Sequence, residues 1–307
     1  MGTMSRPAQT VGKPGGKDRR SKGTVRSIRA FVTRHSLVIG ILLMFLMTWP
    51  IDLSASQVLP FRVPMIVSIL VGYGFVLASL VMTALTLGRG GVASLLKRFL
   101  IWRVGGKWYL VAFLLVPFVD LLGIVLDAAL GGRPIDFNTV LAYRIFGSSA
   151  SLALLVVPYL LFDAVTNGEE IGWRGYVLPR LQTKYSALVS SLILGIVWGA
   201  WHLPKFLAPG NNSSFALLMV DTVAKAVILT WLYNNTGGSL LLTTLCHASW
   251  NTAGMFLPMA NTVTGENLGA SIVAAALLIV TVIVITIREG PARLSRGRPM
   301  QMVGGIS

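Results

Sequence analysis

The sequence predicts an all-α integral membrane protein: a polytopic bundle of about eight transmembrane helices with both termini in the cytoplasm. Two features of the sequence, its composition and its apolar runs, support this fold class. Of the 307 residues, 54% are hydrophobic and only 12% are charged, whereas about 25% charged residues is usual in soluble domains. Several uninterrupted apolar runs also approach or exceed the ~20 residues that a helix needs to cross a bilayer, which excludes the alternating pattern of an outer-membrane barrel.

Eight apolar runs are separated by polar connections, and each run is interpreted as one transmembrane helix. They lie at 36–51, 63–88, 108–130, 145–165, 185–203, 215–233, 239–257 and 270–287.

Lys and Arg are concentrated in segments that the positive-inside rule assigns to the cytoplasm. These segments are residues 1–35, the 88–107 connection and the C-terminal tail. In this topology the 166–184 connection falls on the same side. The expected organisation is a disordered basic cytoplasmic arm (1–35), a membrane domain (36–287) and a cytoplasmic tail (288–307). We expect a multi-pass protein of a cell membrane, and a prokaryotic plasma membrane in particular.

The net charge of +15 does not by itself indicate a nucleic-acid partner. The basic residues lie in tails and connections, and the sequence contains no nucleic-acid-binding module that we can identify. We therefore expect the lipid bilayer, and no nucleic acid, as a partner. Cys246 is the single cysteine, so no intramolecular disulfide can form and no cysteine cluster can bind a metal ion.

His202 lies at the end of an apolar run rich in small residues. Ser191, Gly195 and Gly199 recur every four residues, and His202 follows three residues later. Small residues at this spacing are typical of a close-packing helix seam, so His202 is expected to point inward. For one such histidine alone, a structural hydrogen bond between helices is a simpler explanation than a catalytic role.

Two polar pairs have helical spacing, and Glu169 is adjacent to one of them. His247 and Asn251 are four residues apart and share one helix face. Glu170 and Arg174 have the spacing of an ion pair. Glu169 is rotated by about 100° around the helix axis relative to Glu170, so it is free to contact another partner. The alternative is that both glutamates mark a solvated helix start at the membrane surface.

Other ionisable residues lie within the apolar runs, where charges are costly and are functional candidates by default. Asp221 and Lys225 are four residues apart and are interpreted as a structural pair. Asp120, Asp127 and Asp163 have no evident partner in the sequence. Any of them could belong to a proton or ion path, which leaves a transporter as an alternative.

Three motifs occur in order along the chain: EEIGWR (169–174), WGAWH (198–202) and HASWN (247–251). Together they resemble the motifs of the CAAX-protease and bacteriocin-processing (CPBP, or ABI) family of intramembrane endopeptidases, which includes the type II CAAX prenyl proteases. In that family the patterns are EExxxR, an aromatic residue ahead of a histidine, and HxxxN. The resemblance covers about 160–257, within a protease core expected at about 150–257. Trp198 stands where the family pattern has phenylalanine.

The resemblance implies a role for each matched residue. Glu169 would act with His202 to activate a water molecule, and His247 with Asn251 would stabilise the oxyanion. Peptide hydrolysis independently requires a base for water and donors for the developing negative charge. Glu170 and Arg174 would support the site without taking part in the chemistry.

Glu169, His202 and His247 are also the residue types of a zinc site with two histidines and one glutamate. Zinc is therefore a possible cofactor, since members of the family have been interpreted both as metalloproteases and as glutamic proteases. We favour metal-independent chemistry and no cofactor. The sequence contains no HExxH motif, so the usual two-histidine zinc helix is absent.

The expected function is hydrolysis of peptide bonds in a membrane-embedded or membrane-proximal protein or peptide, at a site that opens toward the cytoplasmic leaflet. Two alternatives remain open at this point. One is a noncatalytic binding or immunity protein with the same fold, and the other is an ion or solute transporter.

Overall fold

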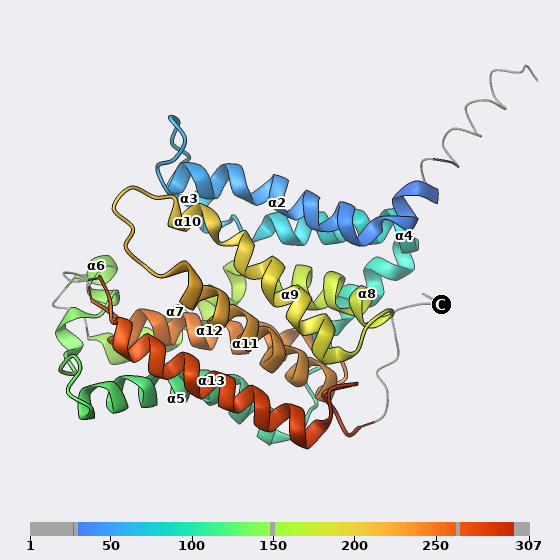
Figure 1. Ribbon diagram of the computed structural model, residues 1–307. Coiled ribbons are helices and arrows are strands. Elements are labelled where there is room, and N and C mark those ends of the chain that lie inside the picture. Colours follow the sequence, from blue (N-terminus) through green and yellow to red (C-terminus); the bar gives the residue numbers. More distant parts are fainter. Residues whose placement is uncertain (1–26, 28–29, 148–150, 262–264, 298–307) are drawn as a thin grey trace, which may run out of the picture.

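The computed structural model describes residues 27, 30–147, 151–261 and 265–297, and most of them are helical (Figure 1). The predicted all-α fold is confirmed. Within the described residues, β structure is limited to the two-residue strands β1 (Ala260–Asn261) and β2 (Gly265–Glu266), which pair antiparallel with Ala260 opposite Glu266.

Long helices form the body of the bundle, and short helices join or extend them. In chain order they are α2 (Ser36–Ala55), α3 (Met65–Ile69), α4 (Tyr73–Lys97), η1 (Arg98–Leu100), α5 (Gly106–Ala129), η2 (Phe137–Thr139), α6 (Ala142–Phe146), α7 (Leu152–Thr166), η3 (Ile171–Val177), α8 (Leu178–Gln182), α9 (Ala187–Trp201), α10 (Leu203–Phe206), α11 (Phe215–Asn235), α12 (Leu240–Phe256) and α13 (Leu268–Glu289).

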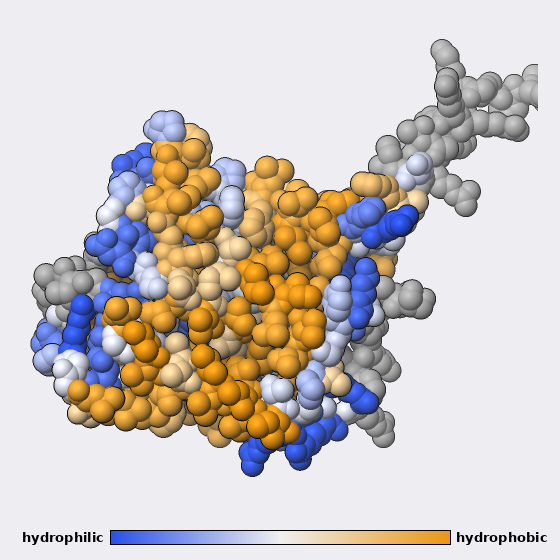
Figure 2. Space-filling view, in the orientation of Figure 1, coloured by the Kyte–Doolittle hydropathy of each residue, from blue (hydrophilic) through white to orange (hydrophobic). Residues whose placement is uncertain are grey.

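The outer surface has the polarity of a membrane protein. Figure 2 shows hydrophobic side chains across the middle of the bundle and hydrophilic ones toward its two ends. Among the described residues, five helices are long and apolar enough to cross a membrane, namely α2, α4 with η1, α5, α11 and α13. A sixth span results if α7 and the segment Ile171–Gln182, which are bent by 45°, are taken together.

The predicted count of eight spans is therefore not confirmed. The runs at 185–203 and 239–257 form the shorter helices α9, of 15 residues, and α12, of 17 residues. At ~1.5 Å per residue they measure about 22 and 26 Å, less than the ~30 Å hydrocarbon layer. Most of α12 is buried inside the bundle, whereas α9 is buried on one side and exposes Val189, Leu192 and Ile196 on the other.

The described ends of the chain lie at the same end of the bundle. The start of α2 and the end of α13 are both on the right in Figure 1, while their assignment to the cytoplasm stays a prediction. Much of the predicted arm (1–35) and the last part of the predicted tail lie outside the described residues. The first part of the tail packs on the bundle, because the carbonyl oxygens of Pro291 and Ala292 accept hydrogen bonds from the start of α9.

The glycine seam of α9 packs closely on another helix, as the spacing predicts, and the structure shows that this helix is α11. A Cβ atom added to Gly195 would lie 2.7 Å from the Cα atom of Val223 and 3.1 Å from the Cβ atom of Ala226. The two backbones therefore approach closely because glycine has no side chain. This contact fixes the position of α9, and with it the position of His202.

Two indoles join the end of α9 to α2. Trp49 donates from Nε1 to the carbonyl oxygen of Trp201 at 3.0 Å, and Trp201 donates from its own Nε1 to Oγ1 of Thr48 at 2.7 Å. Buried indole N–H groups need such partners. The residue directly before His202 is thus held by both its backbone and its side chain.

We expect Gly195→Ala to lower the thermal stability of the protein in detergent, because the new methyl group has to displace the backbone of α11. Overpacking of this kind costs about 1–3 kcal/mol. The matched control is Gly90→Ala on α4, where an added Cβ atom meets nothing within 4 Å and where alanine should stabilise the helix slightly. Unfolding followed by size-exclusion chromatography after heating would measure both, and equal midpoints would contradict this packing.

Candidate active site

The first motif lies within the fold rather than in an exposed connection. After α7, Asn167 and Gly168 lead into Glu169, Glu170 and the π-helix η3, all of whose residues are buried. Gly168 lies against the carbonyl oxygen of Gly72, so a side chain at this position would collide with backbone. The 166–184 segment, expected as a cytoplasmic connection, instead brings its glutamates into the bundle interior.

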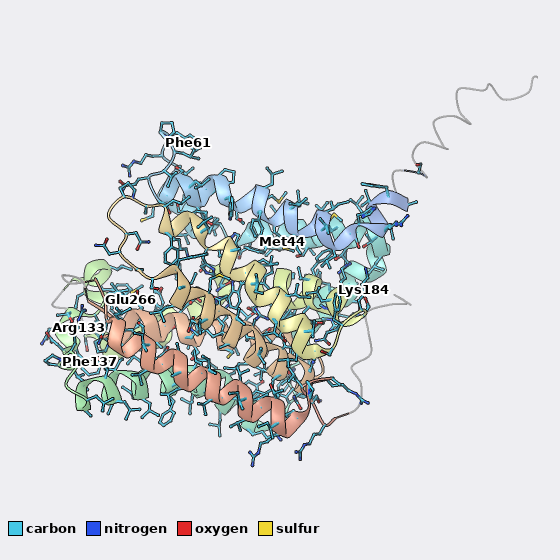
Figure 3. All side chains as sticks on the ribbon, viewed as in Figure 1. Met44, Phe61, Arg133, Phe137, Lys184 and Glu266 are labelled. Carbon is cyan, nitrogen blue, oxygen red and sulfur yellow. The ribbon has the colours of Figure 1, made fainter. Side chains whose placement is uncertain are left out.

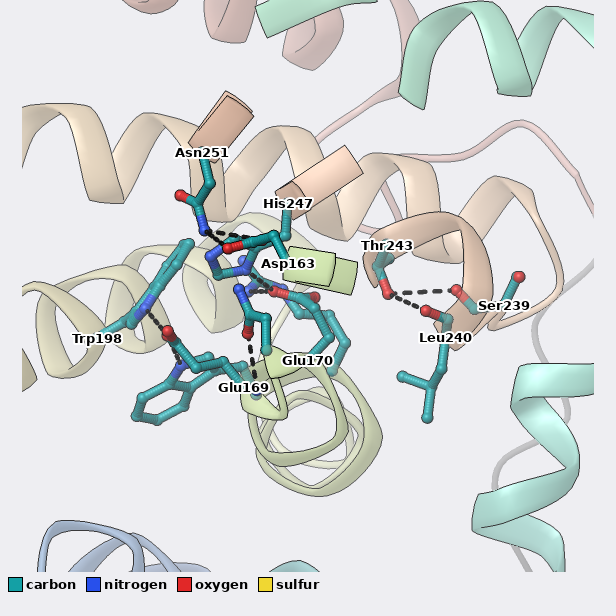
Figure 4. A network of polar contacts seen from close by, with 12 residues as sticks. Asp163, Glu169, Glu170, Trp198, Ser239, Leu240, Thr243, His247 and Asn251 are labelled. Carbon is teal, nitrogen blue, oxygen red and sulfur yellow. Dashed lines mark hydrogen bonds and ion pairs between the residues drawn. The ribbon is translucent and has the colours of Figure 1, made fainter. Parts of the chain in front are cut away.

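Glu169 is half-buried and accepts two indole hydrogen bonds on one oxygen atom. Nε1 of Trp198 donates to its Oε2 atom at 2.7 Å, and Nε1 of Trp173 donates to the same atom at 3.2 Å (Figure 4). The backbone N–H of Glu169 donates to Oδ1 of Asn167 at 3.0 Å. The carboxylate is therefore held in one orientation, and Oε1 is not engaged by these two donors.

Glu170 forms the predicted ion pair with Arg174 and also contacts His247. Its Oε1 atom lies 2.8 Å from Nη1 of Arg174 and 2.9 Å from Nδ1 of His247. All three side chains are almost completely buried, with exposed fractions of 0%, 1% and 4% for Arg174, Glu170 and His247. The guanidinium also lies over the ring of Trp198, 4.7 Å from its centroid. The alternative of a solvated helix start is therefore wrong for Glu170.

His202 follows the last residue of α9, and its tautomer can be inferred from one contact. Its Nδ1 atom lies 2.9 Å from the carbonyl oxygen of Trp198. Since a carbonyl oxygen only accepts hydrogen bonds, Nδ1 carries the proton. In the neutral ring, Nε2 then has a free lone pair and can accept a proton or a hydrogen bond.

Asn251 has a partner that sequence reasoning missed. Its Nδ2 atom donates to both carboxylate oxygens of Asp163, at 3.3 and 3.2 Å (Figure 4). Asp163 is on α7, 88 positions earlier in the chain, so no local spacing indicated this contact. The two donors to Glu169 were also missed, because Trp173 was only a letter of the first motif and Trp198 was only the aromatic position of the second. Their indole N–H groups are the only sequence signal for that role.

One cavity of about 710 Å³ brings the predicted residues together. Glu169, His202, His247 and Asn251 line it, and so does Asp163. It extends to Glu266, which lies at the end of the bundle opposite Lys184 (Figure 3). The predicted topology places that end outside the cytoplasm, so the expected opening toward the cytoplasmic leaflet is not confirmed.

The ionisable residues outside the motifs divide into two groups. Asp221 and Lys225 form the predicted pair, with 2.9 Å between Oδ2 and Nζ. They line the cavity together with Asp120. Asp127 does not line it and instead accepts a hydrogen bond from the backbone N–H of Arg133 at 3.4 Å. The transporter alternative would therefore have to use the same cavity as the proposed catalytic residues.

Glu169, His202 and His247 do not fit a metal site in this arrangement. Throughout the part of the chain that the structure describes, no three His, Cys, Asp or Glu side chains converge closely enough to hold a metal ion. We therefore derive no chemical step through zinc.

The comparisons with known proteins agree with the three motifs. Residues 149–253 match the model of the family described as type II CAAX prenyl endopeptidase Rce1-like. The chain is also 31% identical over 147 residues to CAAX prenyl protease 2 of Methanococcus maripaludis, an alignment that covers 45% of this chain and 52% of the relative. The chain thus spans about half the length of the curated relative that it matches. Over residues 149–253 the resemblance to the CAAX endopeptidase family is confirmed, and this region contains all six residues of the predicted site.

Proposed function

We propose that this chain is an intramembrane endopeptidase that hydrolyses peptide bonds of a membrane-embedded or membrane-proximal protein or peptide. The observation that carries the proposal is the meeting of Glu169, His202, His247 and Asn251 at one cavity. These residues supply the two things that peptide hydrolysis needs, a base for water and hydrogen-bond donors for the developing oxyanion.

In the proposed reaction a water molecule lies between Oε1 of Glu169 and Nε2 of His202. The two indoles on Oε2 of Glu169 leave Oε1 as the oxygen that takes the proton. His202 accepts the second hydrogen bond of the water on its unprotonated Nε2, because Nδ1 is committed to the carbonyl of Trp198. As Glu169 removes the proton, the water oxygen attacks the carbonyl carbon of the substrate.

The attack produces a tetrahedral intermediate with negative charge on the former carbonyl oxygen. Asn251, oriented by Asp163, offers an N–H group to this oxygen. The second donor in this proposal is Nε2 of His247 in its imidazolium form, while the Nδ1–H group of the same ring donates to the Glu170 carboxylate. The proton held by Glu169 then passes to the amide nitrogen. The C–N bond breaks, and the two products leave as a carboxylic acid and an amine.

Glu169→Gln should abolish proteolysis while leaving folded protein in the membrane. Glutamine can still accept the two indole hydrogen bonds, but it cannot take a proton from water, so we expect a loss of at least about 100-fold. The measurement is mass spectrometry of protein termini in membranes from cells producing either protein at matched abundance. Glu289→Gln, at the end of α13, is the control. Identical termini with wild type and Glu169→Gln would favour the noncatalytic binding protein.

Glu170→Gln should reduce both turnover and thermal stability. It leaves the buried Arg174 guanidinium without its counter-charge, and breaking a buried pair in this way costs about 3–5 kcal/mol. The double variant Glu170→Gln with Arg174→Gln should recover much of the stability but not the turnover, since His247 still lacks its carboxylate. Recovery of both quantities would mean that Glu170 supports only the structure.

Chelation should not remove activity. Treatment of the purified protein with 1,10-phenanthroline is expected to leave turnover unchanged, and elemental analysis before treatment is expected to find zinc well below one ion per chain. The physical reason is that, among the residues that the structure describes, no three His, Cys, Asp or Glu side chains converge on one point as metal ligands. Loss of turnover that zinc restores, together with stoichiometric zinc, would replace the glutamic mechanism with a metal-dependent one.

A further inference from the structure

Negative charge is concentrated in the cavity of a strongly basic protein. The chain contains 26 Lys and Arg residues but only 11 Asp and Glu residues. Five of these acids line the cavity, against two lysines, so its lining has a formal charge of −3 before any histidine is protonated. The five acids are Asp120, Asp163, Glu169, Asp221 and Glu266.

Four of the five carboxylates have partners within the protein. Asp163 accepts from Asn251, and Glu169 accepts from Trp173 and Trp198. Asp221 is paired with Lys225 at 2.9 Å, and Glu266 accepts from the backbone N–H of Ser214 at 3.2 Å.

Asp120 is the exception. It lies on α5 in the cavity wall with an exposed fraction of 6%, and it has no hydrogen bond or ion pair to any residue that the structure describes. Lys225 is close enough to act on it electrostatically, but the ammonium group of Lys225 is bound to Asp221. A buried carboxylate without a hydrogen-bonding partner is costly. Its free oxygens in the cavity wall are therefore available to a group of the bound substrate.

The region around Asp120 is connected to the catalytic residues through one aromatic ring. Nζ of Lys225 lies 5.0 Å from the ring centroid of Trp250, and the same ring lies 4.5 Å from the ring of His247. Lys225 neutralises one of the two carboxylates Asp120 and Asp221, which leaves one negative charge there. Because Asp120, Asp221 and His247 line the same cavity, a substrate with its reacting carbonyl at His247 places its neighbouring side chains in the cavity that contains this charge.

We propose that Asp120, together with Asp221, forms a subsite for a basic side chain, lysine or arginine, next to the bond that is cleaved. This subsite names the class of substrate for the proposed endopeptidase function and rests on it. The carboxylate of Asp120 accepts a charge-assisted hydrogen bond from the substrate cation, and the low-dielectric wall strengthens that contact.

The test measures binding separately from hydrolysis. The full-length His202→Ala variant, purified in detergent, keeps every charge of the cavity lining and is expected to be inactive. Its affinity is measured by fluorescence anisotropy for short fluorescein-labelled peptides of alanine, leucine and serine, in which one lysine, glutamine or glutamate is moved along the sequence. At one position we expect lysine to bind about tenfold more tightly than glutamine, and glutamate to bind more weakly than either.

Charge variants of the subsite identify the residue responsible. Asp120→Asn in the same background should remove the preference for lysine, whereas Glu289→Gln, far along α13, should preserve it. Asp221→Asn leaves Lys225 to neutralise Asp120 and should likewise remove the preference for lysine, which provides a second result if Asp120→Asn fails to fold.

Two outcomes separate the subsite from the proteolytic function. Equal affinities for the lysine and glutamine peptides at every position would overturn the subsite, even if wild-type protein cleaves substrates. A lysine preference that depends on Asp120, in a protein without any proteolysis, would retain the subsite and overturn the endopeptidase.

Discussion

The arrangement of the buried motif residues depends on one carboxylate oxygen, Oε1 of Glu170. It lies within 2.9 Å of both a guanidinium nitrogen of Arg174 and an imidazole nitrogen of His247, where all three side chains are almost completely buried. Because charges in such surroundings are costly unless paired, the three groups require one another. The contact joins η3 to α12, and the Trp198 ring beneath Arg174 adds α9 to the same cluster. All three motifs therefore depend on a single buried anion.

The surrounding structure keeps this cluster in place with small residues and indoles. Gly168 allows the start of the first motif to lie against α4, and Gly195 allows α9 to approach α11. Trp198 contributes twice, because its N–H group orients Glu169 while its ring covers Arg174. Each glutamate thus has a separate environment, the first beside the cavity and the second sealed behind it. The adjacent residues Glu169 and Glu170 therefore differ in their surroundings only because they pack against different side chains.

Local spacing predicted much of this arrangement, whereas contacts between distant segments were beyond it. The i,i+4 rule gave the pairs Glu170 with Arg174 and Asp221 with Lys225, because helical neighbours are fixed by geometry. It could not give the contact of Glu170 with His247, 77 positions apart. Hydropathy likewise predicted the helical class but not the number of spans, since it does not distinguish a short helix that is mostly buried among other helices, such as α12, from one that faces lipid.

The π-helix η3 (Ile171–Val177) places one wide turn in the motif segment. A π-helix is bonded i to i+5 rather than i to i+4, and such segments are often found at functional sites. In a regular α-helix such as α12, removal of one residue would rotate the residues on its two sides by about 100° relative to one another. Removal of one residue from Ile171–Val177 would instead allow an ordinary α-helix to form, and the residues before and after this segment would keep nearly the same relative orientation. The motif segment is therefore the part of the bundle in which a shorter sequence can preserve the orientation of its neighbours.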